Sequence, residues 1–313
     1  MRFLHDCALQ HYFEVMKKFT FILKLIVSAI LTAFVFYKFP VGDILTVLKN
    51  VDYAWLAVSF LLGELIILNQ AFRWYYLLIV SKEQKPKFAS LLKYTAVGYL
   101  FNLFAPGGVG GDAYRSIALG KAHNVIAGSV ASVFVARILG LVALCLLFWF
   151  ALPYYSEQLP KQAIWFMALV SLFLIALCIC LAFNPFKKGK FGQFADKLRE
   201  YKKEPLRLLA AMFGSFFMQI LAILMQFALF KAIGISVPIV LVFIVVPVTA
   251  LLTTIPISFN GIGVREWSML SLTAYAINSE QLLASLLLSY AVIILQAAQG
   301  GIFLYFPHDR THF

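Results

Sequence analysis

Two short polar segments interrupt a chain that is otherwise almost continuously apolar. The first runs from Asn102 to Arg115 and reads N-L-F-A-P-G-G-V-G-G-D-A-Y-R. The second runs from Pro256 to Glu266 and reads P-I-S-F-N-G-I-G-V-R-E. Each combines glycines with a carboxylate and an arginine, and arginine is the side chain best suited to bind anions. Because glycine and proline at this density cannot continue a helix, both segments are predicted to be breaks between helices.

The two segments share a short pattern that ends in opposite charges. The first contains Gly-Val-Gly-x-Asp, ending at Asp112, and the second contains Gly-Ile-Gly-x-Arg, ending at Arg265. Pairs of broken helices that enter the membrane from opposite faces occur in secondary transporters built as inverted repeats. The pattern is short enough for chance to supply it, but it favours an inverted repeat.

The composition is that of a polytopic membrane protein. Of 313 residues, 62% are apolar and 13% are charged, about half the charged fraction of a typical soluble domain. In a soluble chain the net charge of +12 would suggest nucleic acid, but here the basic residues are expected on cytoplasmic loops facing anionic lipid. We therefore expect an all-α membrane protein, organised as one domain over residues 1–313, with no nucleic-acid partner.

Metal and cofactor chemistry is not expected. None of the four cysteines has the spacing to a histidine that a metal site requires, and the histidines other than His123 lie in the two tails. The pattern of a nucleotide-binding phosphate loop is also missing from the sequence. We therefore assign no metal ligand, no cofactor and no catalytic residue.

Full helical crossings are expected where about 20 apolar residues run together. They are residues 19–39, 54–80, 123–152, 161–183, 206–233 and 281–306. The basic linker 184–207 and the basic loop 81–93 are predicted to be cytoplasmic by the positive-inside bias. Because two full crossings lie between them, segment 88–122 must begin and end on the cytoplasmic side as a re-entrant hairpin. By the same count of crossings, segment 237–278 begins and ends on the side opposite the cytoplasm, and it is therefore a re-entrant hairpin from the opposite face.

This topology places both chain termini in the cytoplasm and the protein in a bacterial-type inner membrane. Within the basic linker, residues 193–204 carry Phe194, Leu198 and Tyr201 on one side of a helix among charged residues. Such a helix lies at the membrane interface or is a solvated linker, and the sequence leaves both interpretations open.

Seven ionisable side chains fall at membrane depth, where they are costly and usually mark a pathway or a substrate site. They are Glu64, Arg73, Asp112, Arg115, Arg137, Arg265 and Glu266. Four arginines against three carboxylates leave one excess positive charge, and helix N-termini near Gly111 and Val264 would each add about half a charge. The electrostatics favour an anion, and phosphate in particular. The alternative is that Asp112 and Glu266 form closed ion pairs with arginines and only pin the two hairpins.

Three ordered motifs carry a resemblance to a known family. They are Gly98-Tyr-x-x-Asn102-x-x-x-Pro106-Gly-Gly-x-Gly-Gly-Asp-x-x-Arg115, then Arg137-Ile-Leu-Gly140, then Pro256-x-x-x-x-Gly-x-Gly-x-Arg-Glu266. Together with Arg73-Trp74, they resemble the lysylphosphatidylglycerol synthase transmembrane-region family of flippase-like integral membrane proteins over nearly the whole chain. The resemblance implies a membrane domain that moves a lipid between leaflets. Fused members also carry a cytosolic aminoacyltransferase domain, which this sequence lacks, so lysyl transfer from tRNA is not expected.

We therefore expect a lipid translocase that passes an anionic or phosphate-bearing headgroup through a polar cavity between the hairpins. The substrate-binding residues are expected to be Arg73, Asn102, Gly107, Gly108, Gly110, Gly111, Asp112, Arg115, Arg137, Gly261, Gly263, Arg265 and Glu266. Within this set, the two carboxylates would orient the arginines or carry a coupling proton.

Two other functions stay open at this point. One is a membrane-embedded lipid-modifying transferase, or an accessory subunit of a glycosyltransferase or lipid-modification pathway, in which Asp112 or Glu266 acts as a base. The other is a small-anion transporter, which fits the charges but not the family. The expected partner is a membrane lipid with an anionic or phosphate headgroup, and the sequence leaves open a homodimer and a partner from lipid biosynthesis or glycosyl transfer.

Overall fold

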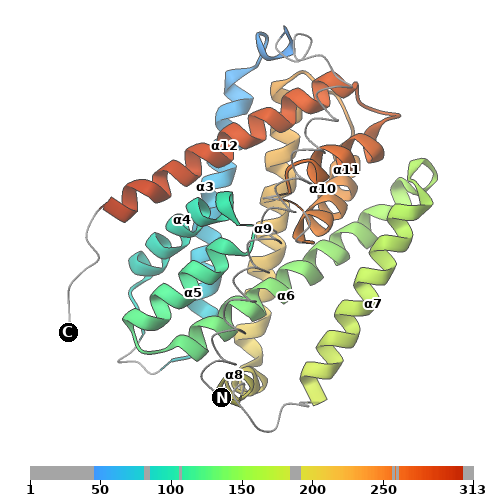
Figure 1. Ribbon diagram of the computed structural model, residues 1–313. Helices are drawn as coiled ribbons and strands as arrows, with labels where there is room; N and C mark the ends of the chain where they lie inside the picture. Colours follow the sequence, from blue (N-terminus) through green and yellow to red (C-terminus); the bar gives the residue numbers. More distant parts are fainter. Residues whose placement is uncertain are drawn as a thin grey trace, which may run out of the picture.

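The computed structural model describes residues 46–80, 85–105, 108–183, 192–255, 258 and 261–305. Within these ranges the secondary structure is helical and no strand forms (Figure 1). The principal helices are α3 (Tyr53–Leu77), α4 (Phe88–Phe104), α5 (Gly110–Ala122), α6 (Ile126–Ala151), α7 (Lys161–Phe183), α8 (Gly192–Glu200), α9 (Pro205–Ala232), α10 (Ile239–Thr254), α11 (Val264–Thr273) and α12 (Ser279–Tyr305). The fold is that of an all-α polytopic membrane protein, as the composition predicts.

Five of these helices, namely α3, α6, α7, α9 and α12, are long and apolar enough to cross a membrane. They correspond to the predicted crossings from 54–80 onward, whereas the predicted crossing 19–39 lies outside the described residues. Their outward faces carry large exposed apolar side chains, among them Phe150 and Phe213. Such a surface suits contact with lipid tails, which are themselves apolar.

Helices α4 and α5 form a hairpin whose break lies near the centre of the molecule, with both outer ends toward α8 (Figure 1). Glycines let the two limbs approach closely. A Cβ atom on Gly111 would lie 2.3 Å from the carbonyl oxygen of Gly98, and one on Gly110 would lie 2.5 Å from that of Phe101. The Asn102 Oδ1 atom accepts the Gly111 backbone N–H at 2.7 Å and so caps the start of α5. The glycine-rich segment therefore ends one helix and packs the next against it.

Replacing Gly111 with alanine should therefore destabilise the protein. The new methyl group would force α4 and α5 apart, and overpacking of this kind costs roughly 1–3 kcal/mol. We expect the midpoint of thermal unfolding in detergent to fall by several degrees. Gly128→Ala in α6 is the matched control, because its Cβ would meet the Ile79 carbonyl oxygen at an ordinary 3.5 Å. Equal midpoints for the two variants would contradict the close approach of α4 and α5.

Helices α10 and α11 form a second hairpin that opens toward the opposite end of the molecule (Figure 1). Its turn requires glycine at two positions, because Gly261 has φ +75° and Gly263 has φ +85°. Gly261 is also pressed against α10, since a Cβ there would lie 2.6 Å from the Thr253 Cγ2 atom. The predicted breaks are thus both present.

Helix α8 packs onto the bundle through its apolar side, together with the residues that follow it. Leu198 and Tyr201 lie in one apolar cluster with Leu77 of α3 and Ala211 of α9. The Tyr201 hydroxyl donates a hydrogen bond to the Leu77 carbonyl oxygen, and burial raises the pKa of Tyr201 well above its usual value. The hydroxyl therefore stays protonated at neutral pH and holds the end of α3. The apolar side of this helix therefore packs against protein, while its charged side chains stay at least partly exposed.

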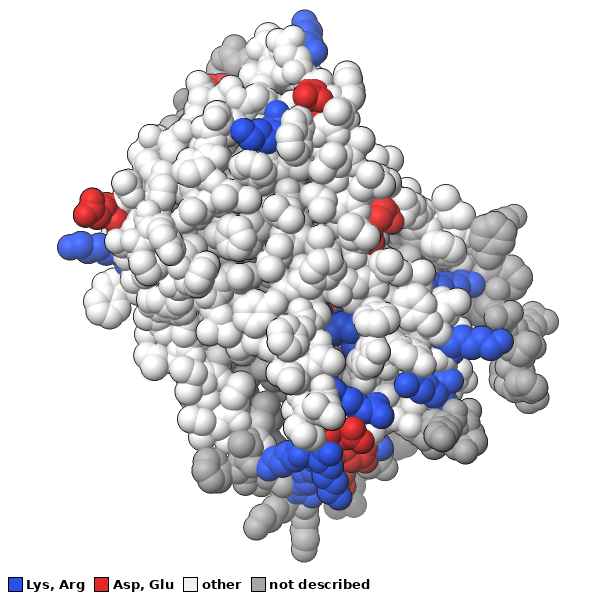
Figure 2. Space-filling model, turned by 180° about the vertical axis from the view of Figure 1, so that it is seen from behind, with Lys and Arg blue, Asp and Glu red and all other residues white. Residues whose placement is uncertain are grey.

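Basic side chains gather at the end of the molecule that carries α8. On the face shown in Figure 2, Lys and Arg cluster at this end, and most of the surface between the two ends is uncharged. The described basic residues from the linker are Lys197, Arg199, Lys202, Lys203 and Arg207. The described basic residues of the linker therefore lie at one end of the molecule.

Candidate functional site

Two adjoining cavities lie where the two hairpin breaks face each other. The larger, here called the arginine chamber, has a volume of about 350 Å³. Its polar lining comprises Gln70, Arg73, Tyr99, Asn102, Asp112, Arg115, Arg137, Gln219, Thr253, Thr254 and Arg265, together with the backbone of Gly108. Since residues of both hairpins border it, the structure brings together the two segments that the sequence singled out.

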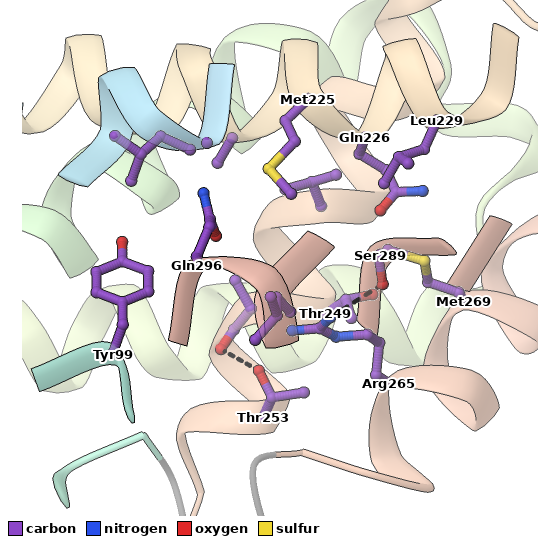
Figure 3. A pocket seen from close by; sticks show the side chains of 16 residues that line it. Tyr99, Met225, Gln226, Leu229, Thr249, Thr253, Arg265, Met269, Ser289 and Gln296 are labelled. Atoms are coloured by element: carbon purple, nitrogen blue, oxygen red, sulfur yellow. Dashed lines mark hydrogen bonds between the residues drawn. The ribbon is translucent and has the colours of Figure 1, made fainter. Parts of the chain in front are cut away.

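The smaller cavity, here called the amide chamber, has a volume of about 240 Å³ (Figure 3). Its polar lining comprises Tyr99, Gln226, Thr249, Thr253, Arg265, Ser289 and Gln296. Three of these residues, Tyr99, Thr253 and Arg265, also border the arginine chamber. The two chambers are therefore neighbours that share part of one wall.

A single carboxylate bridges two arginines in the arginine chamber. Asp112 pairs with Arg115 through Oδ1 at 2.8 Å and with Arg137 through Oδ2 at 2.8 Å. Arg115 also lies over the ring of Trp74, 5.1 Å from its centroid, and that ring is held by a hydrogen bond to Ser132. The Nε and NH1 atoms of Arg115 are buried without a hydrogen-bond partner among the described residues. Asp112 thus orients both arginines but leaves donors unused, as a site for an anion requires.

Arg73 is buried inside the bundle and does not extend to the surface. It is 4% exposed, and its NH1 atom donates to the Ser215 Oγ atom at 2.8 Å. Glycines on two neighbouring helices give the side chain room, since Cβ atoms on Gly140 and Gly214 would each lie 3.6 Å from it. In the described part of the chain no carboxylate pairs with Arg73. Arg73 borders the arginine chamber.

Arg265 contributes a second guanidinium without a carboxylate among the described residues. Its NH1 atom makes a long hydrogen bond of 3.4 Å to the Ser289 Oγ atom, and the guanidinium lies 5.4 Å from the centroid of the Tyr290 ring. Because Arg265 borders both chambers, a bound group in either one can reach it.

Among the described residues, no arginine forms an ion pair with Glu266. Its Oε2 atom accepts the backbone N–H of Gly263 at 2.6 Å, and its Oε1 atom accepts the Tyr290 hydroxyl at 2.6 Å. A glutamate at the third residue of a helix is well placed to cap the start of that helix. Glu266 therefore fastens α11 to α12, and the expected pairing with an arginine is replaced by these two bonds.

Most of the predicted glycines serve the backbone rather than the cavity. Of the predicted glycines that the structure describes, only Gly108 borders the arginine chamber, with φ +62° and open space where a Cβ would lie. Gly110 and Gly111 pack α5 against α4, while Gly261 and Gly263 form the second turn. Gly107, also assigned to the site, lies outside the described residues.

Several residues of the site were not assigned from the sequence. Tyr99 and Thr253 border both chambers, Ser215 holds Arg73, and Tyr290 holds Glu266. The sequence does show polar residues inside apolar crossings, namely Gln219, Gln226, Gln296 and Gln299. It does not show where these side chains lie in space. Glu64 borders neither chamber, and its Oε1 atom is buried without a partner within the described ranges.

The balance of charge in the arginine chamber favours an anionic guest. Four arginines and one carboxylate border it, which leaves three positive charges by formal count. Within the described ranges, no three His, Cys, Asp or Glu side chains lie close enough to hold a metal ion. Its chemistry is that of hydrogen-bond donors and positive charge at the centre of an apolar bundle.

Fold and site together define a multi-pass membrane protein with an arginine-lined internal cavity between two broken helices. A family model described as the lysylphosphatidylglycerol synthase TM region matches residues 21–299, and the chain belongs to this family. No curated protein matches the chain. Family membership makes this a membrane protein related to lipid modification or transport.

Proposed function

We propose that the protein is a lipid translocase, which moves a lipid with a phosphate-bearing, anionic headgroup between the two leaflets. The observation that carries this proposal is the excess of positive charge in the arginine chamber. The headgroup would pass through the chamber while the lipid tails remain in the bilayer.

The unpaired guanidinium groups supply the physical reason. A charge held in a low-dielectric interior without a partner is costly, and a bound anion relieves that cost. The arginine fork donates two parallel hydrogen bonds to phosphate oxygens. Arg73 and Arg265 have no carboxylate among the described residues, and Arg115 keeps two unused donors. A phosphodiester would engage these groups without breaking the Asp112 bridge.

The lengths of the hairpin limbs support a re-entrant arrangement. At 1.5 Å per residue, α5 and α11 span about 20 Å and about 15 Å, which is less than the roughly 30 Å of the hydrocarbon core. Neither limb is long enough to cross, so each hairpin would turn back within the membrane. With the basic α8 end in the cytoplasm, the first hairpin would enter from the cytoplasmic side and the second from the opposite side.

A transferase is less well supported by the same geometry. It would need Asp112 or Glu266 as a free base, but Asp112 is paired with two arginines and Glu266 accepts two hydrogen bonds. Both carboxylates are therefore engaged in holding other groups.

Reconstitution in liposomes tests the proposal. The probe is phosphatidylglycerol labelled on one acyl chain with a fluorophore that dithionite bleaches only in the outer leaflet, with and without a proton gradient. We expect the protein to make inner-leaflet label accessible, with the extracted lipid chemically unchanged. Accessibility equal to that of empty liposomes under both conditions would overturn the proposal, and so would a newly formed lipid product.

A further inference from the structure

The amide chamber is lined by two glutamines whose buried amide nitrogens have no hydrogen-bond partner among the described residues. Gln226 of α9 and Gln296 of α12 are 8% and 2% exposed, and the Nε2 atom of each is buried without a partner among the described residues. Figure 3 shows the two side chains entering the same cavity from different helices. A buried amide left without hydrogen bonds is costly, so the pair offers donors to a guest in the chamber.

The surrounding residues leave the amides free for that guest. Gly63 of α3 provides the space that Gln296 fills, since a Cβ on Gly63 would lie 2.1 Å from its Nε2 atom. Two nearby hydroxyl protons are already engaged, because Ser289 donates to the Leu286 carbonyl oxygen and Thr253 donates to the Ala250 carbonyl oxygen. Among the described residues of this lining, the two amide nitrogens are the buried donors with bonds still to make.

The chemistry of the lining specifies the class of guest. An amide offers two donors and a carbonyl acceptor and carries no charge. It can donate to and accept from a hydroxyl group, whereas it cannot neutralise the charge of a phosphate as an arginine does. Arg265 is the one charged side chain that borders this chamber among the described residues, and it is shared with the arginine chamber. A phosphate at Arg265 would thus leave the rest of a headgroup facing the two amides.

We infer that the amide chamber is a second headgroup subsite, which binds the uncharged, hydroxyl-bearing part of a phosphodiester headgroup while Arg265 holds the phosphate. This inference rests on the proposed translocase function. It also gives the headgroup a way out of the charged chamber, because a neutral site beside a strongly charged one binds the headgroup without trapping it.

A pair of matched lipids tests the subsite. Acyl-labelled phosphatidylglycerol and phosphatidylpropanol carry the same single phosphodiester charge and the same three carbons, but only the first has hydroxyl groups. In the liposome assay we expect the wild type to move phosphatidylglycerol about tenfold faster, as two added hydrogen bonds would give. The double variant Gln226→Leu/Gln296→Leu should bring the ratio of the two rates close to one, and each single variant should give an intermediate ratio.

Gln299→Leu provides the matched control, because it makes the same change on α12 at a position that borders neither chamber. Its ratio should equal that of the wild type. If neither lipid moves, the proposed function itself fails. If both lipids move but the wild-type ratio is one, or the glutamine variants keep the wild-type ratio, the subsite is overturned and the chamber holds only water.

Discussion

Lipid movement should fall about a hundredfold when Arg265 is replaced by glutamine, while the stability of the fold changes little. Losing one partner of a buried charge pair costs roughly 2–5 kcal/mol, and here the pair would form only with the bound phosphate. In the unliganded protein Arg265 has no carboxylate among the described residues and only one long hydrogen bond, so little is lost from the fold. The checks are the initial rate in the liposome assay and the midpoint of thermal unfolding in detergent.

Two control variants sharpen this result. Arg265→Lys keeps the charge but loses the fork that matches phosphate, so its rate should lie between those of the wild type and Arg265→Gln. Arg207→Gln removes a basic residue near the α8 end that pairs with Glu204, and it should leave the rate unchanged. If Arg265→Gln moves lipid at the wild-type rate, Arg265 does not contact the headgroup.

The Asp112→Asn variant is expected to lose both stability and transport. It leaves Arg115 and Arg137 without their shared carboxylate, and removing one partner of a buried ion pair costs about 3–5 kcal/mol. That cost corresponds to a fall of roughly 5–15 °C in the unfolding midpoint. Thermal unfolding followed by tryptophan fluorescence in detergent measures it.

A second change separates the structural role of Asp112 from the role of the arginines. In the double variant Asp112→Asn/Arg137→Gln the charge removed with the carboxylate is balanced by the charge removed with the arginine. We expect this variant to recover much of the lost stability but not transport, because one of the arginines proposed to bind phosphate is gone. An Asp112→Asn protein as stable as the wild type would contradict the bridged geometry.

The closed ion-pair alternative describes only part of the site. Asp112 is paired in the way that alternative requires, whereas Glu266 is bonded to Gly263 and Tyr290 instead. Ion pairs that only hold the α4–α5 hairpin in place would explain Arg115 and Arg137. It leaves Arg73 and Arg265 unexplained, and these are the arginines that an anionic guest would satisfy.

The helix breaks could be predicted from the sequence because glycine and proline act locally on the backbone. The positions of the arginines in apolar segments likewise reveal that charge is held inside the membrane. Length and hydrophobicity were enough to predict the five crossings within the described residues, since a helix needs about 20 apolar residues to span the bilayer. These are properties of single segments, and the structure agrees with them.

The pairing between helices could not be predicted in the same way. Tyr290 lies on α12 and contacts Glu266 of α11 across a turn, and no spacing in the sequence announces that contact. Glycine is equally suited to admit a ligand or a neighbouring helix, so Gly110 and Gly111 were assigned to substrate although they pack against α4. The amide chamber was missed for a similar reason, because Gln226 and Gln296 meet only in the folded bundle.

The distance between the two breaks tests the central claim most directly, that both meet at the middle of the membrane around one chamber. Spin labels attached at Val109→Cys and Ile262→Cys, in a protein lacking its native cysteines and reconstituted in lipid, allow this distance to be measured by pulsed electron paramagnetic resonance. We expect a separation well below the roughly 30 Å thickness of the hydrocarbon core. A separation equal to or greater than that thickness would place the two segments in ordinary loops on opposite faces and contradict the account.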